Sequence, residues 1–597
     1  MYRAPLRELR FVLHELIGDH TLASIPHFAD YSQDLADSVL EQAGKFAEEV
    51  LAPINRKGDV TGAQWTPDGV RMPPEFKEAY ARFAADGWCQ LRAPQEHGGT
   101  GAPSVLGTAV EELWASANLS FKLCPMLTQG TIEAIERCGT PEQKAKYLPK
   151  LVTGEWTGTM NLTEPQAGSD LGAIRTRAVR EGDHYRLYGQ KIFITYGDHD
   201  YTPNIIHMVL ARVEGAPSGV KGISMFIVPK VLVNDDGSLG ERNDVRCVSI
   251  EHKLGIHASP TCVLAYGDNG GAIGYLVGEE NRGLEYMFIM MNAARLAVGL
   301  EGYAMAERAY QQALSWARER IQGRPAGAAS SDGKSLPITY HPDVKRMLLT
   351  MKANADAARA ISLYTSMQLD LARHHPDEQS RKAALARGEL LIPIVKGFST
   401  EIGVAMASLG VQVHGGMGFI EETGAAQHLR DARITTIYEG TTAIQANDLL
   451  NRKLGRDSGA AMRALLDDMR KELEALEIGD PVVAASRSAA LRAIGALDEA
   501  TSALLRTYGE TPAAALGVHV PYLMLCGYAI GGWLMAKAHA IAAANVTSDP
   551  AFYRAKMQIA RFYFDHVLPQ GRALADIVSQ GGNAIADADP ELFAAIG

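Results

Sequence analysis

Cysteine is scarce in this sequence, and its spacing argues against two kinds of scaffold. The six cysteines are scattered and include no C-x-x-C pair. That spacing argues against a disulfide framework and against a zinc site, and it suits a reducing interior. The opening segment, MYRAPLRELRFVLHELIGDH, has no long apolar stretch and no small-residue cleavage site, so it does not predict a secretory signal. We therefore expect a cytoplasmic protein without a metal site.

Basic residues are also fewer than acidic residues. The chain carries 58 Lys and Arg against 69 Asp and Glu, a net charge of −11, so it has no basic footprint for nucleic acid. A hydrophobic fraction of 47% and a charged fraction of 21% are ordinary for a soluble protein. Its 597 residues exceed what one hydrophobic core usually serves, so we expect several domains.

One uncharged stretch, residues 520–536 (VPYLMLCGYAIGGWLMA), bears on the expectation of a soluble protein. It falls just short of the roughly 20 apolar residues that cross a bilayer. It also contains Pro521 and three glycines, and Lys537 ends it. These features favour a buried helix, with a membrane-contacting helix as the alternative. We expect no transmembrane segment.

The periodicity of apolar residues divides the chain into four blocks. Residues 1–155 show helical spacing, as in DSVLEQAGKFAEEVLAPIN. Residues 156–280 contain the alternating or short apolar runs of strands: HYRLYGQKIFIT, IIHMVLARV, GISMFIVPK, VRCVSI and TCVLAY. Long helical patterns return over residues 281–455, with candidates at 283–320 and 343–372 and a Gly-, Pro- and Ser-rich exposed loop between them over 323–342. Residues 456–597 are rich in Ala and Leu and predict one more helical domain.

Two short motifs stand in the β block. The first, LTEPQAGSD (162–170), contains a Gly-Ser turn, whose backbone N–H groups are able to point at an anion such as a pyrophosphate. Taken alone, it is more typical of an ordinary surface turn. The second, GQKIFIT (189–195), is a strand pattern that ends on a hydroxyl residue, and threonine is a common strand former.

A third segment, residues 412–445, contains a candidate base. It holds the glycine cluster HGGMG (414–418), where a backbone approaches a ligand closely, and continues to IYEGTT (437–442). Glu439 stands between Tyr438 and Gly440 in otherwise apolar sequence, and partial desolvation there would raise the carboxyl pKa and favour proton abstraction. The structural alternative is that Glu439 caps the next helix. Periodicity alone does not decide between these two interpretations.

The three motifs occur in the order and approximate spacing found in the acyl-CoA dehydrogenases, which the sequence resembles over roughly residues 40–455. LTEPQAGSD and GQKIFIT resemble the family's paired flavin-binding segments, and RDARITTIYEGTTAIQ resembles the segment with its catalytic glutamate. The resemblance implies an α+β multidomain fold. Its expected parts are an N-terminal helical domain (1–155), a central β-barrel-like, flavin-binding domain (156–280), a four-helix-type bundle with the base (281–455) and an additional C-terminal helical domain (456–597).

The resemblance also implies a reaction. FAD is the expected cofactor, and an acyl-CoA thioester is the expected substrate. Glu439 would remove the α-proton while the thioester carbonyl accepts hydrogen bonds from the Glu439 N–H and a flavin ribityl hydroxyl, as in an oxyanion hole. The β-hydrogen would leave as hydride to flavin N5, which yields a trans-2-enoyl-CoA. The electrons would then pass to an electron-transfer flavoprotein.

Further site residues follow from matches to the family, position by position. The residues implied to contact FAD are Leu162 and Thr163 at the isoalloxazine edge, Gly168 and Ser169 at the pyrophosphate, Phe193 and Thr195 near the ring, and Thr441. The residues implied to hold the FAD of a neighbouring subunit are Gln412, Gly416 and Arg320. The residues implied to bind substrate are Asn292 and Arg295 along the CoA channel and Tyr438 and Gly440 beside the base.

Two departures from the family pattern matter. Gly323 replaces an aromatic residue, which puts the FAD contact between subunits in doubt. Ala293 and Ala294 occupy the neighbourhood in which some relatives carry their base, so no second carboxylate competes with Glu439. The shared FAD sites imply a homodimer, with a tetramer as the alternative.

The extra residues at both ends resemble a long subgroup of the family. It includes the 3-methylmercaptopropionyl-CoA dehydrogenases and bacterial enzymes of fatty acid oxidation. The acyl group stays open, from short to long or methylthio-substituted. Two other functions stay open as well: an acyl-CoA oxidase, and a non-catalytic FAD-binding protein of the same fold.

Overall fold

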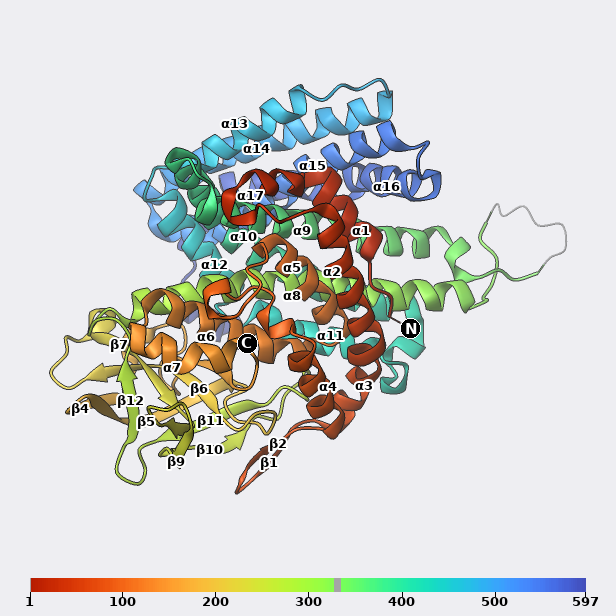
Figure 1. Ribbon diagram of the computed structural model, residues 1–597. Coiled ribbons are helices and arrows are strands. Elements are labelled where there is room, and N and C mark those ends of the chain that lie inside the picture. The colour runs from red at the N-terminus through yellow and green to blue at the C-terminus, as the bar shows by residue number, and fades with distance from the viewer. Residues whose placement is uncertain (1, 327–333, 597) are drawn as a thin grey trace. The chain divides into compact units, whose positions relative to one another are not determined.

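The chain folds as two compact units. The computed structural model describes residues 2–326 and 334–596. One unit comprises residues 42–297, and the other comprises residues 1–41 together with 298–597 (Figure 1). The centre of the loop expected over 323–342, residues 327–333, lies outside the described residues.

Helices form the first part of the 42–297 unit, as the apolar spacing predicts. They are α3 (Ala52–Thr61), α4 (Pro74–Ala85), α5 (Ser104–Ala117), α6 (Leu119–Cys138) and α7 (Pro141–Val152). Capping side chains set two of the helix starts. The Asn118 side chain accepts a hydrogen bond from Phe121 N at 3.1 Å, and Thr140 forms a capping box with Gln143. A hairpin of β1 (Gln64–Thr66) and β2 (Gly69–Arg71) interrupts the helices and was not predicted.

The strands of the same unit close into a small barrel. They are β3 (Thr157–Asn161), β4 (Arg177–Glu181), β5 (His184–Thr195), β6 (Ile205–Val213), β7 (Ile223–Pro229), β10 (Val245–Ile250), β11 (Thr261–Tyr266) and β12 (Ala272–Leu276). The ring runs β5–β12–β7–β6–β4 and closes because β4 pairs with both β5 and β6. The strands β11 and β10 continue from β5, and β3 lies beside β6. The prediction of a β-barrel-like domain is therefore confirmed, as are the five strand segments expected from the sequence.

Long helices make up the other unit. They are α8 (Gly283–Glu319), which continues from the first unit, α9 (Pro342–His374), α10 (Glu378–His414), α11 (Ala425–Ala432) and α12 (Thr442–Asn447). The additional residues form α13 (Ala460–Glu474), α14 (Pro481–Glu510), α15 (Pro512–Asn545), α16 (Pro550–Phe562), α17 (Gln570–Gln580), α18 (Gly582–Ala586) and α19 (Glu591–Ile596). Helix α15 packs against α14, α16 and α17 and against α9 and α10 (Figure 1).

Helix α15 contains the uncharged stretch, and nearly every residue from 522 to 536 is buried. Among the described residues, two segments are long and apolar enough to cross a membrane: Glu378–Phe419 and Pro512–Asn545. Their most apolar windows are 83% and 61% buried inside the protein, as in the core helices of soluble proteins. The prediction of a buried helix over 520–536 is confirmed.

The first residues of the chain pack on α16, near the other end of the sequence. They begin with α1 (Leu6–Arg10). Lys556 Nζ lies 2.8 Å from Glu8 Oε2, Tyr553 OH donates to Glu15 Oε2 at 2.7 Å, and the Arg7 guanidinium stands 3.9 Å from the centroid of the Phe552 ring. The N-terminal segment is thus part of the same core as the C-terminal helices.

Candidate functional site

The two predicted flavin segments lie side by side in the 42–297 unit. Ile192 N donates to Thr163 O at 2.9 Å, which joins the LTEPQAGSD turn to strand β5. The Lys191 ammonium donates to Leu162 O at 2.8 Å and to Glu164 Oε1 at 2.9 Å. These contacts place Leu162 and Thr163 beside the end of β5 that carries Phe193.

A buried ion pair, Lys191 with Glu164, fastens this junction. Neither residue was assigned a role from the sequence, although both stand inside the two motifs. Burial lowers the pKa of Lys191 to about 8. Burial alone would raise the pKa of Glu164, but the Lys191 charge and hydrogen bonds from Thr176 and Arg175 N lower it to about 2. This buried ion pair therefore holds the LTEPQAGSD turn and strand β5 together.

The positions expected to contact FAD form an accessible surface at this junction. Phe193 is 58% exposed and has a φ of 58°, an uncommon conformation for a bulky residue. Leu162, Thr163 and Thr195 are half-buried, and Gly168 and Ser169 are exposed. A side chain added at Gly168 would meet nothing within 4 Å, so its backbone is open to a ligand. An exposed aromatic ring and an open Gly-Ser turn, on two segments joined by the hydrogen bond from Ile192 N to Thr163 O, fit a flat ring system that carries phosphates.

The residues expected at a neighbour's FAD lie in the other unit, on exposed surface. Arg320 follows α8, Gln412 stands in the last turn of α10, and Gly416 comes just after it. A patch of exposed apolar side chains, Met417, Phe419 and Ile420, follows Gly416, and Phe419 is 85% exposed. An exposed apolar patch of this kind marks a surface suited to a partner.

Glu439 stands in a turn with an unusual backbone. Its φ is 55° and that of Gly440 is 86°, so two successive residues are left-handed. The N-cap of α12 is Thr441, whose hydroxyl accepts from Ile444 N at 3.3 Å, and not Glu439. The carboxylate therefore does not serve as the cap, and its side chain is half-buried.

Buried groups surround this turn. Lys396 Nζ donates to Gly440 O at 2.6 Å, and Gln445 Nε2 donates to Glu439 O at 3.0 Å. The Tyr438 hydroxyl donates to Glu301, a fully buried carboxylate on α8. Burial and the Glu301 charge raise the pKa of Tyr438 well above its ordinary value, so this hydroxyl stays a hydrogen-bond donor.

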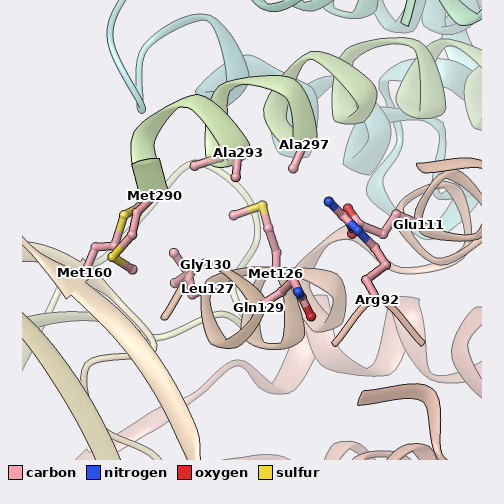
Figure 2. A pocket seen from close by; sticks show the side chains of 11 residues that line it. Arg92, Glu111, Met126, Leu127, Gln129, Gly130, Met160, Met290, Ala293 and Ala297 are labelled. Atoms are coloured by element: carbon pink, nitrogen blue, oxygen red, sulfur yellow. Dashed lines mark hydrogen bonds and ion pairs between the residues drawn. The ribbon is translucent and has the colours of Figure 1, made fainter. Parts of the chain in front are cut away.

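The two residues expected along the CoA channel lie on α8 in the 42–297 unit. Asn292 is half-buried and Arg295 is buried. The neighbouring Ala293, Ala294 and Ala297 line a slot between α6 and α8 (Figure 2). The remaining lining residues are Arg92, Glu111, Met126, Leu127, Gln129, Gly130, Met160 and Met290.

Figure 2 shows which side chains lie at the two ends of the slot. Met160 and Met290 stand at one end, and the ion pair of Arg92 with Glu111, 2.8 Å, stands at the other. The buried Lys122 adjoins the ion-pair end, where its ammonium lies 3.8 Å from Glu111 and donates to Ala297 O at 3.1 Å. The cavity volume is about 20 Å³, little more than the roughly 10–15 Å³ that one water molecule requires. No sequence motif predicted this slot, because its residues come from segments that are distant in the sequence.

Among residues 2–326 and 334–596, no group of three or more His, Cys, Asp and Glu side chains is arranged to hold a metal ion.

Comparison with known proteins identifies the class to which this fold and these motifs belong. Residues 34–155, 159–268 and 281–454 match the models of the acyl-CoA dehydrogenase N-terminal, middle and C-terminal domains. Residues 465–589 match a model described as "Acetyl-CoA dehydrogenase C-terminal like". The chain belongs to the acyl-CoA dehydrogenase family.

Particular relatives narrow this class. The chain is 47% identical to a 3-methylmercaptopropionyl-CoA dehydrogenase of Ruegeria pomeroyi over 98% of its own length and 99% of that protein. It is 34% identical to a broad-specificity linear acyl-CoA dehydrogenase, FadE5, of Mycobacterium tuberculosis, over 99% and 100% of the two chains. The crystal structure of an acyl-CoA dehydrogenase from Bacillus anthracis, complexed with FAD, superposes with a TM-score of 0.73 at 21% identity and covers 100% of this chain and 94% of that one. This last likeness shows the shared fold.

Proposed function

We propose that this protein catalyses the α,β-dehydrogenation of a short acyl-CoA thioester to the trans-2-enoyl-CoA, with Glu439 as the base. As a member of the acyl-CoA dehydrogenase family, the chain is an oxidoreductase that uses FAD. The observation that carries the proposal is the Glu439 turn, a half-exposed carboxylate on a strained left-handed backbone, because such strain concentrates at functional sites.

The residues of the 42–297 unit that would hold FAD are Leu162, Thr163, Gly168, Ser169, Phe193 and Thr195. The open Gly-Ser turn suits the pyrophosphate, and the exposed Phe193 ring suits the flat ring system. When bound, FAD supplies the two-electron acceptor that the reaction needs. Thr441, which stands in the same turn as Glu439, would also contact FAD. Arg320, Gln412 and Gly416 would hold the FAD of a second copy, which makes a homodimer the proposed minimal assembly.

Glu439 would take the α-proton on its carboxylate. The α-C–H of a thioester is a weak acid, so the base must approach it in a fixed geometry and the carbonyl must be polarised. Tyr438 and Gly440 flank the base and would border the reacting part of the substrate. Asn292 and Arg295 would border the CoA moiety. No second carboxylate competes on the same turn of α8, because Ala293 and Ala294 stand there.

The slot between α6 and α8 would receive the acyl chain, since α8 also carries Asn292 and Arg295. Its charged end favours a short acyl group over a long apolar one. Met126, Met160 and Met290 give it a soft, polarizable lining that adapts to an irregular group such as a thioether. The 3-methylmercaptopropionyl group, named for the relative at 47% identity, is the first substrate to test.

The proposed electron acceptor is an electron-transfer flavoprotein, and the proposed location is the cytoplasm. All six cysteines are free, which suits a reducing compartment. Enzyme reduced by substrate should be reoxidised faster by an electron-transfer flavoprotein than by air. The opposite order would make the protein an acyl-CoA oxidase, and failure of every acyl-CoA to reduce the flavin would favour a binding protein.

The decisive variant is Glu439→Gln in the FAD-loaded enzyme. It should keep its yellow colour and FAD content, since the side-chain shape is preserved, but the flavin absorbance should fail to bleach when acyl-CoA is added without oxygen. Bleaching at the wild-type rate would refute the assignment of the base.

A further inference from the structure

We infer that Lys396 and Gln445 are positioning residues that fix the backbone of Glu439 for proton abstraction. This inference rests on the proposed function. It concerns two groups that act through the turn that carries the base.

The backbone of the turn requires outside support. A left-handed conformation is strained for residues other than glycine, and glutamate is not among the residues that adopt it readily. Glu439 nevertheless has a φ of 55°. Such a conformation persists only where the surroundings over-determine it. Gly440 leaves no room for a side chain, because an added Cβ there would lie 2.8 Å from Gln445 Nε2.

Both carbonyl groups of the turn accept hydrogen bonds from buried donors. Lys396 and Gln445 are each 0% exposed. The Lys396 ammonium reaches Gly440 O at 2.6 Å, and Gln445 Nε2 reaches Glu439 O at 3.0 Å and Gly440 O at 3.2 Å. A hydrogen bond from a charged donor is about twice as strong as a neutral one, and a lysine is almost never fully buried without such a partner.

These bonds also orient the peptide groups. In a trans peptide the C=O and the following N–H point in opposite directions. The carbonyls of Glu439 and Gly440 point toward the buried donors, so the N–H groups of Gly440 and Thr441 point away from them. The donors therefore determine which way the whole turn faces, and with it the direction in which the Glu439 side chain leaves the backbone.

The flanks of the turn are fixed to α10 and α8. Thr442 Oγ1 donates to Glu401 Oε1 at 2.6 Å, and Glu401 stands five residues after Lys396 on α10. On the other side, the Tyr438 hydroxyl is bonded to Glu301 on α8. Since the flanks are held independently, loss of Lys396 or Gln445 should release the turn without releasing the surrounding segment.

The test compares Lys396→Met and Gln445→Leu with wild type in the FAD-loaded enzyme. A displacement of the base by about 1 Å costs on the order of 100-fold in rate, so kcat should fall by about that factor while KM and FAD content change little. Proton abstraction should become more rate-limiting, so the kinetic isotope effect with α-deuterated acyl-CoA should rise. Lys396→Arg, which keeps a charged donor, should recover part of the rate. Without substrate, the backbone amides of residues 437–442 should exchange hydrogen faster in both variants.

Lys556→Met is the matched control, because it removes another buried lysine of the same unit whose ammonium contacts Glu8 and Asp356 and not the turn. It should lower stability but leave the isotope effect and the exchange of residues 437–442 unchanged. Wild-type isotope effects and wild-type exchange in Gln445→Leu would overturn the inference, even if Lys396→Met fails to fold. Failure of the proposed function looks different, since Glu439→Gln would then bleach like wild type while the exchange difference at the turn persists.

Discussion

Substitution of Met290 by alanine should shift the acyl-chain preference toward longer substrates. Met290 lies at one end of the slot, is 0% exposed and projects from α8, the helix that also carries Asn292 and Arg295 (Figure 2). The change removes the three terminal heavy atoms of the side chain. The space they leave is contiguous with the slot, so an acyl chain longer by about three methylene groups should be able to enter it.

The size of this shift follows from the burial of those methylene groups. Each buried CH₂ contributes about 0.8 kcal/mol, so a fully occupied space is worth about 2.4 kcal/mol, or about 60-fold in kcat/KM. The relevant quantity is the ratio of kcat/KM for the longer substrate to that for the substrate which wild type prefers. Partial collapse of the slot around the shortened residue would reduce the gain to about tenfold.

The control for this experiment is Met287→Ala. Met287 is also 0% exposed and stands on the same helix, but it does not line the slot. Both substitutions should lower stability by about 2–5 kcal/mol, because both remove a buried side chain. Only Met290→Ala should change the substrate ratio. An equal change in the two variants, or a shift of less than about threefold in Met290→Ala, would refute the placement of the acyl chain.

Two further predictions concern buried charges. Lys191→Met leaves Glu164 buried without its cation and should weaken FAD retention at least tenfold, measured as the flavin-to-protein ratio after gel filtration. Lys146→Met, which removes contacts with the exposed Asp235 and with Val233 O, should retain FAD, and equal loss in both variants would contradict the assigned surface. Burial would raise the pKa of Glu307, but Lys352 and Arg359 lower it to about 2. Because this lies below the ordinary value, the carboxylate stabilises the fold above about pH 4.5, by about 3 kcal/mol, and this contribution is lost as the pH falls toward 2. The unfolding free energy of Glu307→Gln should therefore depend less on pH in this range, and an unchanged dependence would contradict the argument.

Local patterns predicted much of the fold. The strands β5, β6, β10 and β11 begin and end where the alternating runs do, and α8 and α9 match their helical patterns within two residues. These elements are long or regular enough for their period to be read from the sequence. The β1–β2 hairpin has strands of only three residues, which is too short for any period to show. The closure of the barrel depends on pairing between distant strands, which no local pattern contains.

The candidate site, like the fold, could be predicted from the sequence only in part. Glu439 and the two flavin segments stand in contiguous motifs, so the sequence names them, and their roles stay predictions. The groups that support them come from elsewhere: Lys396 is 44 residues from Gly440, and Glu301 is 137 residues from Tyr438. The sequence around a single lysine in an apolar helix does not indicate which group accepts its hydrogen bond. Only the packing of α8, α10 and the turn brings these groups together.

The packing of the first residues on α16 bears on how the chain folds during synthesis. Residues 1–41 belong to the same unit as residues 298–597, so the 42–297 unit is inserted between two parts of one core. The partners of Glu8 and Glu15, Lys556 and Tyr553, emerge more than 500 residues later, which at about 5–20 residues per second is roughly 25 to 110 seconds. During that interval the amphipathic N-terminal segment lacks part of its native surface, although Gln311 and Lys352, which contact Arg3 and Glu8, emerge earlier. The middle unit is able to fold first, while the unit that carries the base is completed only when the last helices arrive.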